Sequence, residues 1–350
     1  MDIKELLRKA VEAKASDLHL VVGVPPALRV DGQLQFIADE SNIDRATIEK
    51  LAFALIDEKQ QERFRASREL DFGYEQDGFR FRVNLHFEKG NIGMVARVIV
   101  DKIPSLEDLL MPKIVYNLLN LKQGLILLTG PTGCGKSTTL AAMIEYINAN
   151  RFCHIVTLED PIEYLFHPNK SIIKQRQLGS DMLSFAEGLK HALRQDPNVI
   201  MVGEMRDLET IGTTITLAET GHLVLATLHT YSAAQTIDRI IDIFPPHQQN
   251  QVRQQLATTL ASVISQRLIP KMDGGRIAAR EVMINTPAVS NMIREAKIAQ
   301  IRSVLETSSK EGMHSMDQDL QRLYKEKAIS KEEAQMHMEN PEVLEKFKLI

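Results

Sequence analysis

Helical and strand-like patterns of apolar residues alternate over the first hundred residues. Apolar positions three or four residues apart predict helices over 2–14 and 44–57. Alternating polar and apolar positions predict strands at 16–20, 28–30, 33–36, 69–75, 79–87 and 92–100. A tight turn is predicted at Asp31-Gly32, because these residue types tolerate the positive φ of a hairpin turn. The order of elements indicates a small α+β domain, residues 1–100, with its helices packed on one sheet.

A second pattern begins after residues 101–123, which are predicted to be a linker with one short helix. Short apolar strands then alternate with helices. The strands are predicted at 125–129, 154–158, 199–202 and 223–228, and the helices at 136–149, 185–193 and 208–218. Strands this short and apolar are typical of a parallel sheet with helices on both faces. Residues 124–285 are therefore predicted to form a parallel, doubly wound α/β domain.

The last part of the chain, residues 286–350, is predicted to be helical. Ser315 with Gln318, and Ser330 with Glu333, have the spacing of capping boxes, in which the first side chain and the fourth satisfy each other's backbone N–H groups. Two helices are therefore expected to begin at these serines.

Composition narrows the class of protein. The chain has 350 residues, 44% hydrophobic and 25% charged, as in an ordinary globular protein of two domains. A net charge of −4 and the lack of Trp argue against a nucleic-acid partner. The two cysteines, Cys134 and Cys153, form no CxxC pair, which argues against a disulfide scaffold and a cysteine zinc site. No run approaches the roughly 18 apolar residues of a transmembrane segment, and the chain is expected to be cytosolic.

A glycine-rich segment follows the strand predicted at 125–129. Residues 130–137 match the pattern GxxxxGK[ST] and open a predicted helix. Glycines allow backbone N–H groups to face phosphates, and the helix N-terminus adds positive potential there. Lys136 is expected to reach the β- and γ-phosphates of ATP, and Ser137 to ligate Mg²⁺. The predicted ATP-binding residues are Gly130, Pro131, Thr132, Gly133, Cys134, Gly135, Lys136, Ser137 and Thr138.

The apolar strand 199–202 leads into a carboxylate. Glu204 follows it after Gly203, and this is the position where nucleotide hydrolases carry an acid that orients water. Glu204 is therefore the candidate general base. Gly203 stands where a metal-binding Asp is usual, so direct metal binding by this strand is not expected. The alternative is a surface acid that happens to follow a strand.

A cluster of acids follows the strand 154–158. Glu159, Asp160 and Glu163 lie at its carboxyl end, where open α/β sheets bind ligands. This position favours a functional role over a solvated acidic face. Glu163 could share the activation of water with Glu204.

Two histidines bracket the strand 223–228. His222 and His229 are too far apart along an extended segment to share a metal ion. A histidine at the carboxyl end of a strand can respond to the γ-phosphate. Their spacing fits ordinary structural histidines equally well.

Arginines gather on neighbouring strands of the first domain. Arg80 and Arg82 are two residues apart and share a face of the predicted sheet, and Arg97 lies on the adjacent strand. From the residues alone, a solvated sheet face is the better interpretation.

Together these motifs resemble the secretion ATPase superfamily, and within it the PilT/PilU family of type IV pilus retraction ATPases. The resemblance extends over the whole chain. Its motifs are ASDLHL at 15–20, GPTGCGKST at 130–138, LEDPIE at 158–163, VGEMRD at 202–207, ETGHL at 219–223 and TLHT at 227–230. In the family these include the Walker A motif, the Asp box, an atypical Walker B motif and the His box, so the glycine at Gly203 is a family trait.

The resemblance implies a PAS-like N-terminal domain joined to a RecA-like P-loop ATPase domain with a helical C-terminal region. It implies a cytoplasmic homohexamer that binds ATP and Mg²⁺ and lies at the inner membrane. The expected partners are the pilus platform protein in that membrane and a paralogous retraction ATPase. The implied site residues are the catalytic acids Glu204 and Glu163, the nucleotide-linked His222 and His229, and the arginine-finger candidates Arg80, Arg82 and Arg97.

The chain departs from the family pattern in two places. Cys134 replaces a common serine in the loop, a change that should leave the backbone contacts intact. The segment 288–295 reads AVSNMIRE where the family usually has AIRNLIRE, so Ser290 replaces an arginine and retraction competence is left open. The C-terminal sequences lean towards PilU, and the choice between the paralogues also stays open.

The leading hypothesis is a hexameric ATPase that drives pilus retraction and twitching motility. An accessory PilU-type retraction ATPase and a pilus-extension or secretion assembly ATPase are the close alternatives. Extension motors usually carry a long extra N-terminal region and a four-cysteine zinc site, which this sequence lacks. A nucleic-acid translocase fits the composition poorly, and intact Lys136, Ser137 and Glu204 argue against a subunit that does not hydrolyse ATP.

Overall fold

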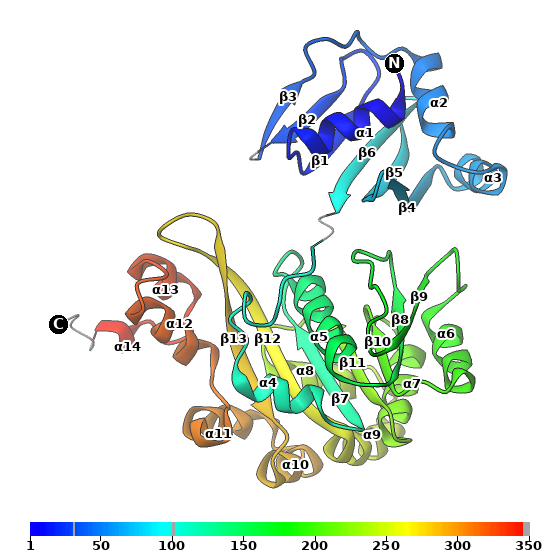
Figure 1. The fold of residues 1–350 in the computed structure, drawn as a ribbon. Coiled ribbons are helices and arrows are strands. Elements are labelled where there is room, and N and C mark those ends of the chain that lie inside the picture. Colours follow the sequence, from blue (N-terminus) through cyan, green and yellow to red (C-terminus); the bar gives the residue numbers. More distant parts are fainter. Residues whose placement is uncertain (31, 100–101, 346–350) are drawn as a thin grey trace. The chain divides into compact units, whose positions relative to one another are not determined.

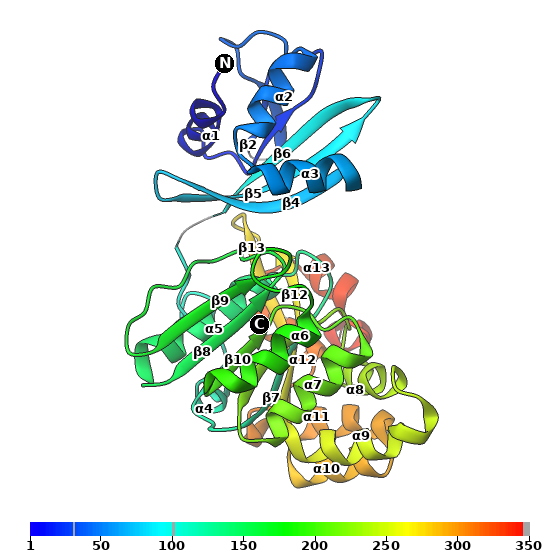
Figure 2. The ribbon, with the colours of Figure 1, turned by 90° about the vertical axis from the view of Figure 1, so that its right-hand side faces the viewer.

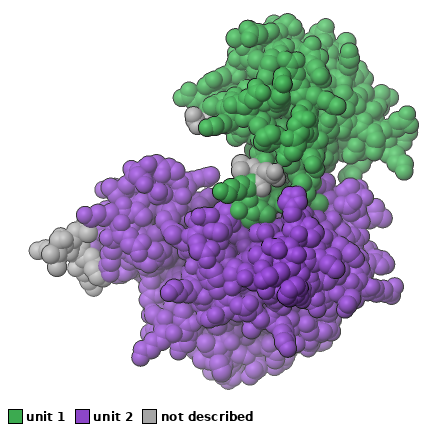
Figure 3. All heavy atoms as spheres, viewed as in Figure 1, with its two compact units in different colours: residues 1–103, 161–165 green, residues 104–160, 166–350 purple. Residues whose placement is uncertain are grey.

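The computed structural model describes residues 1–30, 32–99 and 102–345. The chain divides into two compact units, coloured separately in Figure 3. The first consists of Met1–Ile103 with the short segment Pro161–Leu165, and the second of Pro104–Asp160 with Phe166–Ile350. Asp31 of the predicted turn and the boundary predicted at residues 100 and 101 lie outside the described residues.

The first unit is one antiparallel sheet with helices on one face. Its elements are α1 (Ile3–Glu12), β1 (Asp17–Leu20), β2 (Ala27–Val30), β3 (Gln33–Phe36), α2 (Arg45–Phe53), α3 (Glu58–Ser67), β4 (Glu69–Gln76), β5 (Phe79–Glu88) and β6 (Asn91–Ile99). The strand order is β3-β2-β1-β6-β5-β4 (Figure 1). Leu6, Ile48 and Phe64, one from each helix, share a single core with alternate strand residues. The predicted α+β arrangement is confirmed.

One helix of this unit was not predicted. The predicted helix 44–57 ends at Phe53, and α3 begins after Asp57, which forms a capping box with Gln60. Phe64 is the only buried residue of α3. The helix therefore has no apolar stripe for a periodicity argument to detect.

The second unit is built on a seven-stranded sheet. Up to the end of that sheet its elements are α4 (Lys113–Leu119), β7 (Gly124–Thr129), α5 (Lys136–Asn150), β8 (His154–Glu159), β9 (Ile172–Gln177), α6 (Phe185–Ala192), β10 (Val199–Val202), α7 (Leu208–Glu219), β11 (Leu223–Leu228), α8 (Ala233–Asp242), α9 (Pro246–Thr259), β12 (Leu260–Pro270) and β13 (Arg276–Ile284). The strand order is β13-β12-β7-β11-β10-β8-β9 (Figures 1 and 2).

The sheet is mixed rather than wholly parallel. Strands β12, β7, β11, β10, β8 and β9 run parallel, but β13 pairs with β12 in the antiparallel direction. The prediction of a parallel sheet is therefore wrong at this edge, and β9, β12 and β13 were not predicted. β12 follows α9 directly at Leu260, without a turn residue that would separate helix from strand.

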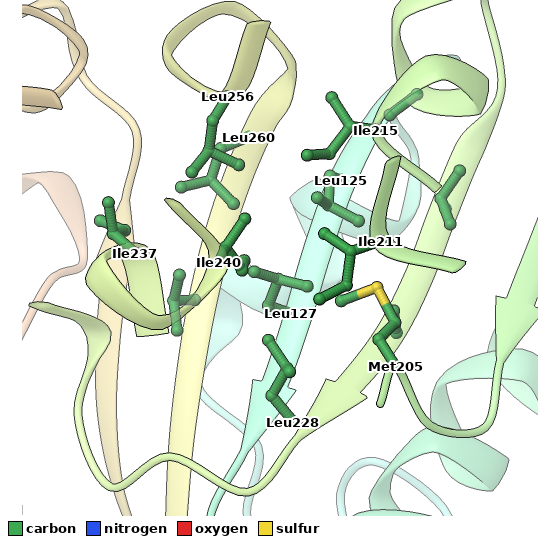
Figure 4. Packing of buried hydrophobic residues seen from close by; sticks show 14 of the residues in the cluster. Leu125, Leu127, Met205, Ile211, Ile215, Leu228, Ile237, Ile240, Leu256 and Leu260 are labelled. Carbon is green, nitrogen blue, oxygen red and sulfur yellow. The ribbon is translucent and has the colours of Figure 1, made fainter. Parts of the chain in front are cut away.

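Helices cover both faces of this sheet, as the short apolar strands predicted. Figure 4 shows Ile211 of α7 and Ile240 of α8 against Leu127 of β7. α9 adds Leu256 to the same core. α5 packs on β7 without contributing to this core, so it covers the opposite face, with α4 beside it. The loops at the carboxyl ends of the parallel strands are left free to form a site.

The C-terminal part is helical, as predicted. It comprises α10 (Pro287–Arg294), α11 (Ile301–Thr307), α12 (Met316–Lys325), α13 (Lys331–His337) and α14 (Glu342–Glu345). The capping box of Ser315 with Gln318 is confirmed. Ser330 caps α13 by accepting from the Glu333 backbone N–H at 3.2 Å, without the reciprocal bond. None of the helices in the described ranges has the length and hydrophobicity needed to cross a bilayer.

Candidate nucleotide site

The parallel strands bring their carboxyl ends to one edge of the sheet. β7, β11 and β10 are neighbours, and their register places Thr129 beside Leu228 and Val202 beside Ala226. The residues that follow these strands, Gly130, Glu204 and His229, therefore meet at this edge. Ligands of open α/β sheets bind at such an edge.

The loop between β7 and α5 has the backbone of a phosphate cradle. Gly130, Gly133 and Gly135 all have positive φ, at 143°, 78° and 86°. A Cβ at Gly130 would lie 2.2 Å from the Gln266 carbonyl oxygen of β12, so only glycine fits there. The loop ends at the N-terminus of α5, where the backbone N–H groups and the helix dipole favour an anion. This geometry fits the phosphates of a nucleotide.

Lys136 lies over this loop. Its Nζ donates to the carbonyl oxygens of Gly130 at 2.7 Å and Pro131 at 3.0 Å. These two bonds hold the positively charged ammonium group of Lys136 at the phosphate loop. Cys134 is buried, and burial raises the pKa of its thiol despite the opposing charge of Lys136. The serine-to-cysteine change therefore places an inert, uncharged group inside the loop.

Glu204 is fixed by two neighbours. Arg206 holds both carboxylate oxygens, with Nε 2.8 Å from Oε1 and Nη2 2.8 Å from Oε2. His229 Nε2 lies 3.0 Å from the same Oε1, and its Nδ1 lies 3.5 Å from Thr132 Oγ1 in the loop. A ring with its proton on Nε2 donates to Glu204 and accepts from Thr132. His229 therefore connects the predicted base to the phosphate loop.

The charges around Glu204 keep it ionised. Burial acts to raise its pKa, but the hydrogen bond and charge of Arg206, with smaller effects from His229 and Lys136, lower the pKa below its ordinary value. An ionised carboxylate at this position can accept a proton from water.

The structure gives a reason for the glycine that precedes Glu204. A Cβ at Gly203 would lie 3.0 Å from the Leu158 carbonyl oxygen and 3.3 Å from Glu159 Cα of β8. Thr227 Oγ1 also donates to the Gly203 carbonyl. The neighbouring backbone thus leaves little room for the aspartate that is usual in this strand.

The acid cluster after β8 is divided between the two units. Glu159 is buried, and its Oε1 accepts from Thr157 Oγ1 at 2.7 Å and Gln175 Nε2 at 3.0 Å. These contacts indicate that Glu159 stabilises the fold. Glu163 falls in the segment Pro161–Leu165 of the first unit. The structure therefore does not group Glu163 with the loop, and its catalytic role stays a prediction.

His222 lies at the start of β11, whereas His229 follows its end. The strand between them spans about 20 Å at its usual rise. His222 Nδ1 lies 3.0 Å from the Leu217 carbonyl oxygen, at the end of α7. Within this chain the structure brings His229, but not His222, to the loop.

The three arginine-finger candidates share the face of the first unit's sheet that carries no helix. Arg82 and Arg97 are cross-strand partners on β5 and β6, and Arg80 precedes Arg82 on the same face. Arg97 Nε donates to Asp17 Oδ1 at 2.8 Å, and Arg80 Nε donates to the Ile162 carbonyl oxygen at 3.2 Å. The predicted common face is confirmed, and the arginine-finger role stays a prediction.

A cavity of about 410 Å³ opens beside the loop. Thr132 and Gly133 line it, with Tyr231, Arg267 and Arg276 of the same unit. Its volume is in the range of small-molecule sites. Among the residues the structure describes, no three His, Cys, Asp or Glu side chains are placed to hold a metal ion. A cation here would be held by Ser137 and the phosphates, as Mg²⁺ usually is in nucleotide sites.

The sequence interpretation missed two polar contacts of this site. Arg206 follows Glu204 by two residues, and that short spacing was the available signal. Gln266 of β12 donates to the Cys134 carbonyl oxygen. Since β12 itself was not predicted, no pattern could place Gln266 beside the loop.

The family description "Type II/IV secretion system protein" matches residues 1–346. The chain belongs to this family. The type IV pilus retraction ATPase PilT of Pseudomonas aeruginosa is 46% identical over 343 residues, covering 98% of this chain and 99% of that protein. The type IV pilus ATPase PilU of the same organism is 40% identical over 342 residues, covering 97% and 91%.

A solved structure has the same fold. The crystal structure of the pilus retraction motor PilT with bound ADP is 45% identical, with a TM-score of 0.93, and the match covers 99% of this chain and all of that one. The predicted fold class, an α/β protein with an antiparallel-sheet N-terminal domain and a nucleotide-binding domain, is confirmed. The loop at residues 130–137 and the family together identify the chain as an ATPase.

Proposed function

We propose that this chain is the subunit of a homohexameric motor that hydrolyses ATP to drive type IV pilus retraction and twitching motility. The observation that carries the proposal is the full-length match to PilT in both sequence and structure. The hydrolytic residues Lys136, Ser137 and Glu204 are all present in the matching segment. A binding protein without activity would not need a charged and fixed Glu204.

In the proposed mechanism the loop binds the phosphates and Glu204 takes a proton from the attacking water. Lys136 moves its ammonium from the loop carbonyls to the β- and γ-phosphates. Ser137 would hold Mg²⁺, which would supply positive charge to neutralise the phosphates. His229 links Glu204 to Thr132, so it can transmit the state of the loop to the base.

The first unit supplies the remaining proposed roles. Glu163 assists water activation. Arg80, Arg82 and Arg97 act as arginine fingers that approach nucleotide at a domain or subunit interface. The fixed partner of Arg97 is Asp17, whose carboxylate is buried while the arginine remains 63% exposed. An exposed guanidinium on a rigid sheet is suited to this role.

The proposed location is the cytoplasm, at the inner membrane, through the pilus platform protein. A paralogous retraction ATPase is a further proposed partner. An accessory PilU-type role is the second candidate, since PilU matches over nearly the same length. A pilus-extension motor is the third candidate. Its deletion would have the opposite effect on the number of pili from deletion of a retraction motor.

The test is the number of surface pili in a deletion strain of the source organism. Loss of a retraction motor leaves cells with excess pili and no twitching, because extension continues unopposed. Complementation with the wild-type chain should restore both, and complementation with Lys136→Ala should restore neither. Loss of pili on deletion would show an extension motor instead, and full rescue by Lys136→Ala would contradict an ATP-driven role.

A further inference from the structure

Two buried polar side chains lie side by side behind the nucleotide loop. Gln266 of β12 and Arg280 of β13 are cross-strand partners, and each is 2% exposed. A buried amide or guanidinium is costly unless its hydrogen bonds are satisfied. Their partners therefore show what the pair stabilises.

The Gln266 amide connects the middle of the phosphate loop to the helix that follows it. Its Nε2 donates to the Cys134 carbonyl oxygen at 2.6 Å, and its Oε1 accepts from Thr139 Oγ1 at 3.0 Å. Cys134 belongs to the loop, and Thr139 to the first turn of α5. The backbone carbonyl oxygen of Gln266 also lies against Gly130, as described above. One residue thus contacts the start, the middle and the helical end of the loop.

Arg280 fixes which way this amide points. Its Nε donates to Gln266 Oε1 at 3.1 Å. A guanidinium can only donate and the Cys134 carbonyl can only accept, so a single orientation of the amide satisfies both. Burial lowers the pKa of Arg280 to about 10, which leaves it charged at neutral pH. Asp319 of α12 lies nearby as its counter-charge, and its Oδ2 accepts from the Arg280 backbone N–H at 2.7 Å.

We propose that Gln266 is a positioning residue of the nucleotide loop and that Arg280 holds it in the orientation the loop requires. By fixing the Cys134 carbonyl, Gln266 keeps the following N–H groups directed towards the phosphates. The inference rests on nucleotide binding at residues 130–137 and is independent of the pilus role.

Calorimetric titration of Mg-ADP into the purified full-length protein tests the inference. Gln266→Leu should weaken ADP binding about 10-fold, because the Cys134 carbonyl loses its donor. Arg280→Lys should weaken it less, since the amide remains. The double variant should bind no more weakly than Gln266→Leu alone, because Arg280 acts only through the amide.

Ser262→Ala is the matched control. Ser262 is fully buried on the same strand and donates to the Met283 carbonyl of β13, but it does not touch the loop. It should leave ADP affinity unchanged. If Gln266→Leu does not fold, Gln266→Glu carries the test, since it keeps an acceptor for Thr139 and Arg280 but sets an oxygen against the Cys134 carbonyl.

The inference is overturned if the folded Gln266 variants bind ADP within about twofold of wild type, or if the losses of the two single variants multiply in the double variant. Wild-type protein that binds no ADP would contradict the nucleotide site itself, which is a separate result.

Discussion

At the scale of single residues, the proposed role of Glu204 as the base depends on how its carboxylate is held. Arg206 occupies both oxygens of the carboxylate and His229 a second position on one of them. In this state the Glu204 carboxylate is ionised and is held by both neighbours. Each carboxylate oxygen has two lone pairs, so Oε2 can accept from a water molecule while Arg206 holds it, and Arg206 acts on the proposed base by lowering its pKa.

Arg206→Met should move the acid limb of the pH–rate profile to higher pH. The base works when deprotonated, and the wild-type pKa of Glu204 is lowered chiefly by Arg206 against the effect of burial. Without the guanidinium the pKa rises, and activity is lost at a higher pH as the solution is acidified. Profiles of kcat against pH measure this, with Lys190→Met as an exposed control that pairs with Glu187 and Glu209. An unchanged acid limb would show that Arg206 does not set the charge of Glu204.

The residues of the site that the sequence predicted are those carried by local motifs. Lys136 and Glu204 follow apolar strands by fixed spacings, and His229 directly follows a third strand. Their meeting follows from parallel strand order, which short apolar strands indicate. Gln266 could not be predicted, because its contact with Cys134 joins residues 132 positions apart through an unpredicted strand.

At the scale of elements, residues 288–294 of the altered segment lie in α10, which packs on α9. Ser290 is buried, and its Oγ donates to the Ala257 carbonyl oxygen at 2.7 Å and accepts from Arg294 Nη2 at 2.9 Å. The serine therefore has a structural role in this chain. An arginine side chain at the same position would have to displace that packing.

Ser290→Arg should lower the free energy of unfolding by about 1–3 kcal/mol, because it overfills a buried position and removes the bond to Ala257. Urea denaturation followed by circular dichroism measures this. Asn291→Arg, an exposed neighbour on the same helix, should change stability by less than about 0.5 kcal/mol. Equal stability of Ser290→Arg and wild type would mean that the site can accept the family's usual arginine.

Most elements of the chain were predictable, although β9, α8 and α9 were not among them, and the failure to predict α3 and the β12–β13 pair has physical causes. β10 and β11 have the predicted bounds, because fully buried parallel strands are short apolar runs with clear ends. α3 was missed because it buries one side chain. The β12–β13 pair was missed because β12 continues α9 and carries buried polar residues such as Ser265 and Gln266.

At the scale of the whole molecule, the proposed catalytic groups are distributed over two compact units. The loop, Glu204 and His229 belong to the second unit, and Glu163 and the three arginines to the first. A motor that converts hydrolysis into movement between units needs groups of this kind on both. We therefore expect the arginines to affect turnover more than nucleotide affinity.

Arg82→Ala should reduce the rate of ATP hydrolysis at least about 10-fold while leaving ADP affinity nearly unchanged, since an arginine finger stabilises charge that develops in the transition state. Phosphate release and calorimetry provide the two readouts. Arg65→Ala is the control within the same unit, because Arg65 lies on α3 near the ring of Phe53. Full activity of Arg82→Ala would remove Arg82 from the proposed machinery.

The most direct test of the central claim, that ATP bound at residues 130–137 is hydrolysed with Glu204 as the base, is steady-state phosphate release by Glu204→Gln. Glu209→Gln, an exposed acid of the same unit, serves as the control. The account predicts that Glu204→Gln binds ADP as wild type does but hydrolyses ATP at least ~100-fold more slowly. Hydrolysis at the wild-type rate by folded Glu204→Gln protein would contradict it.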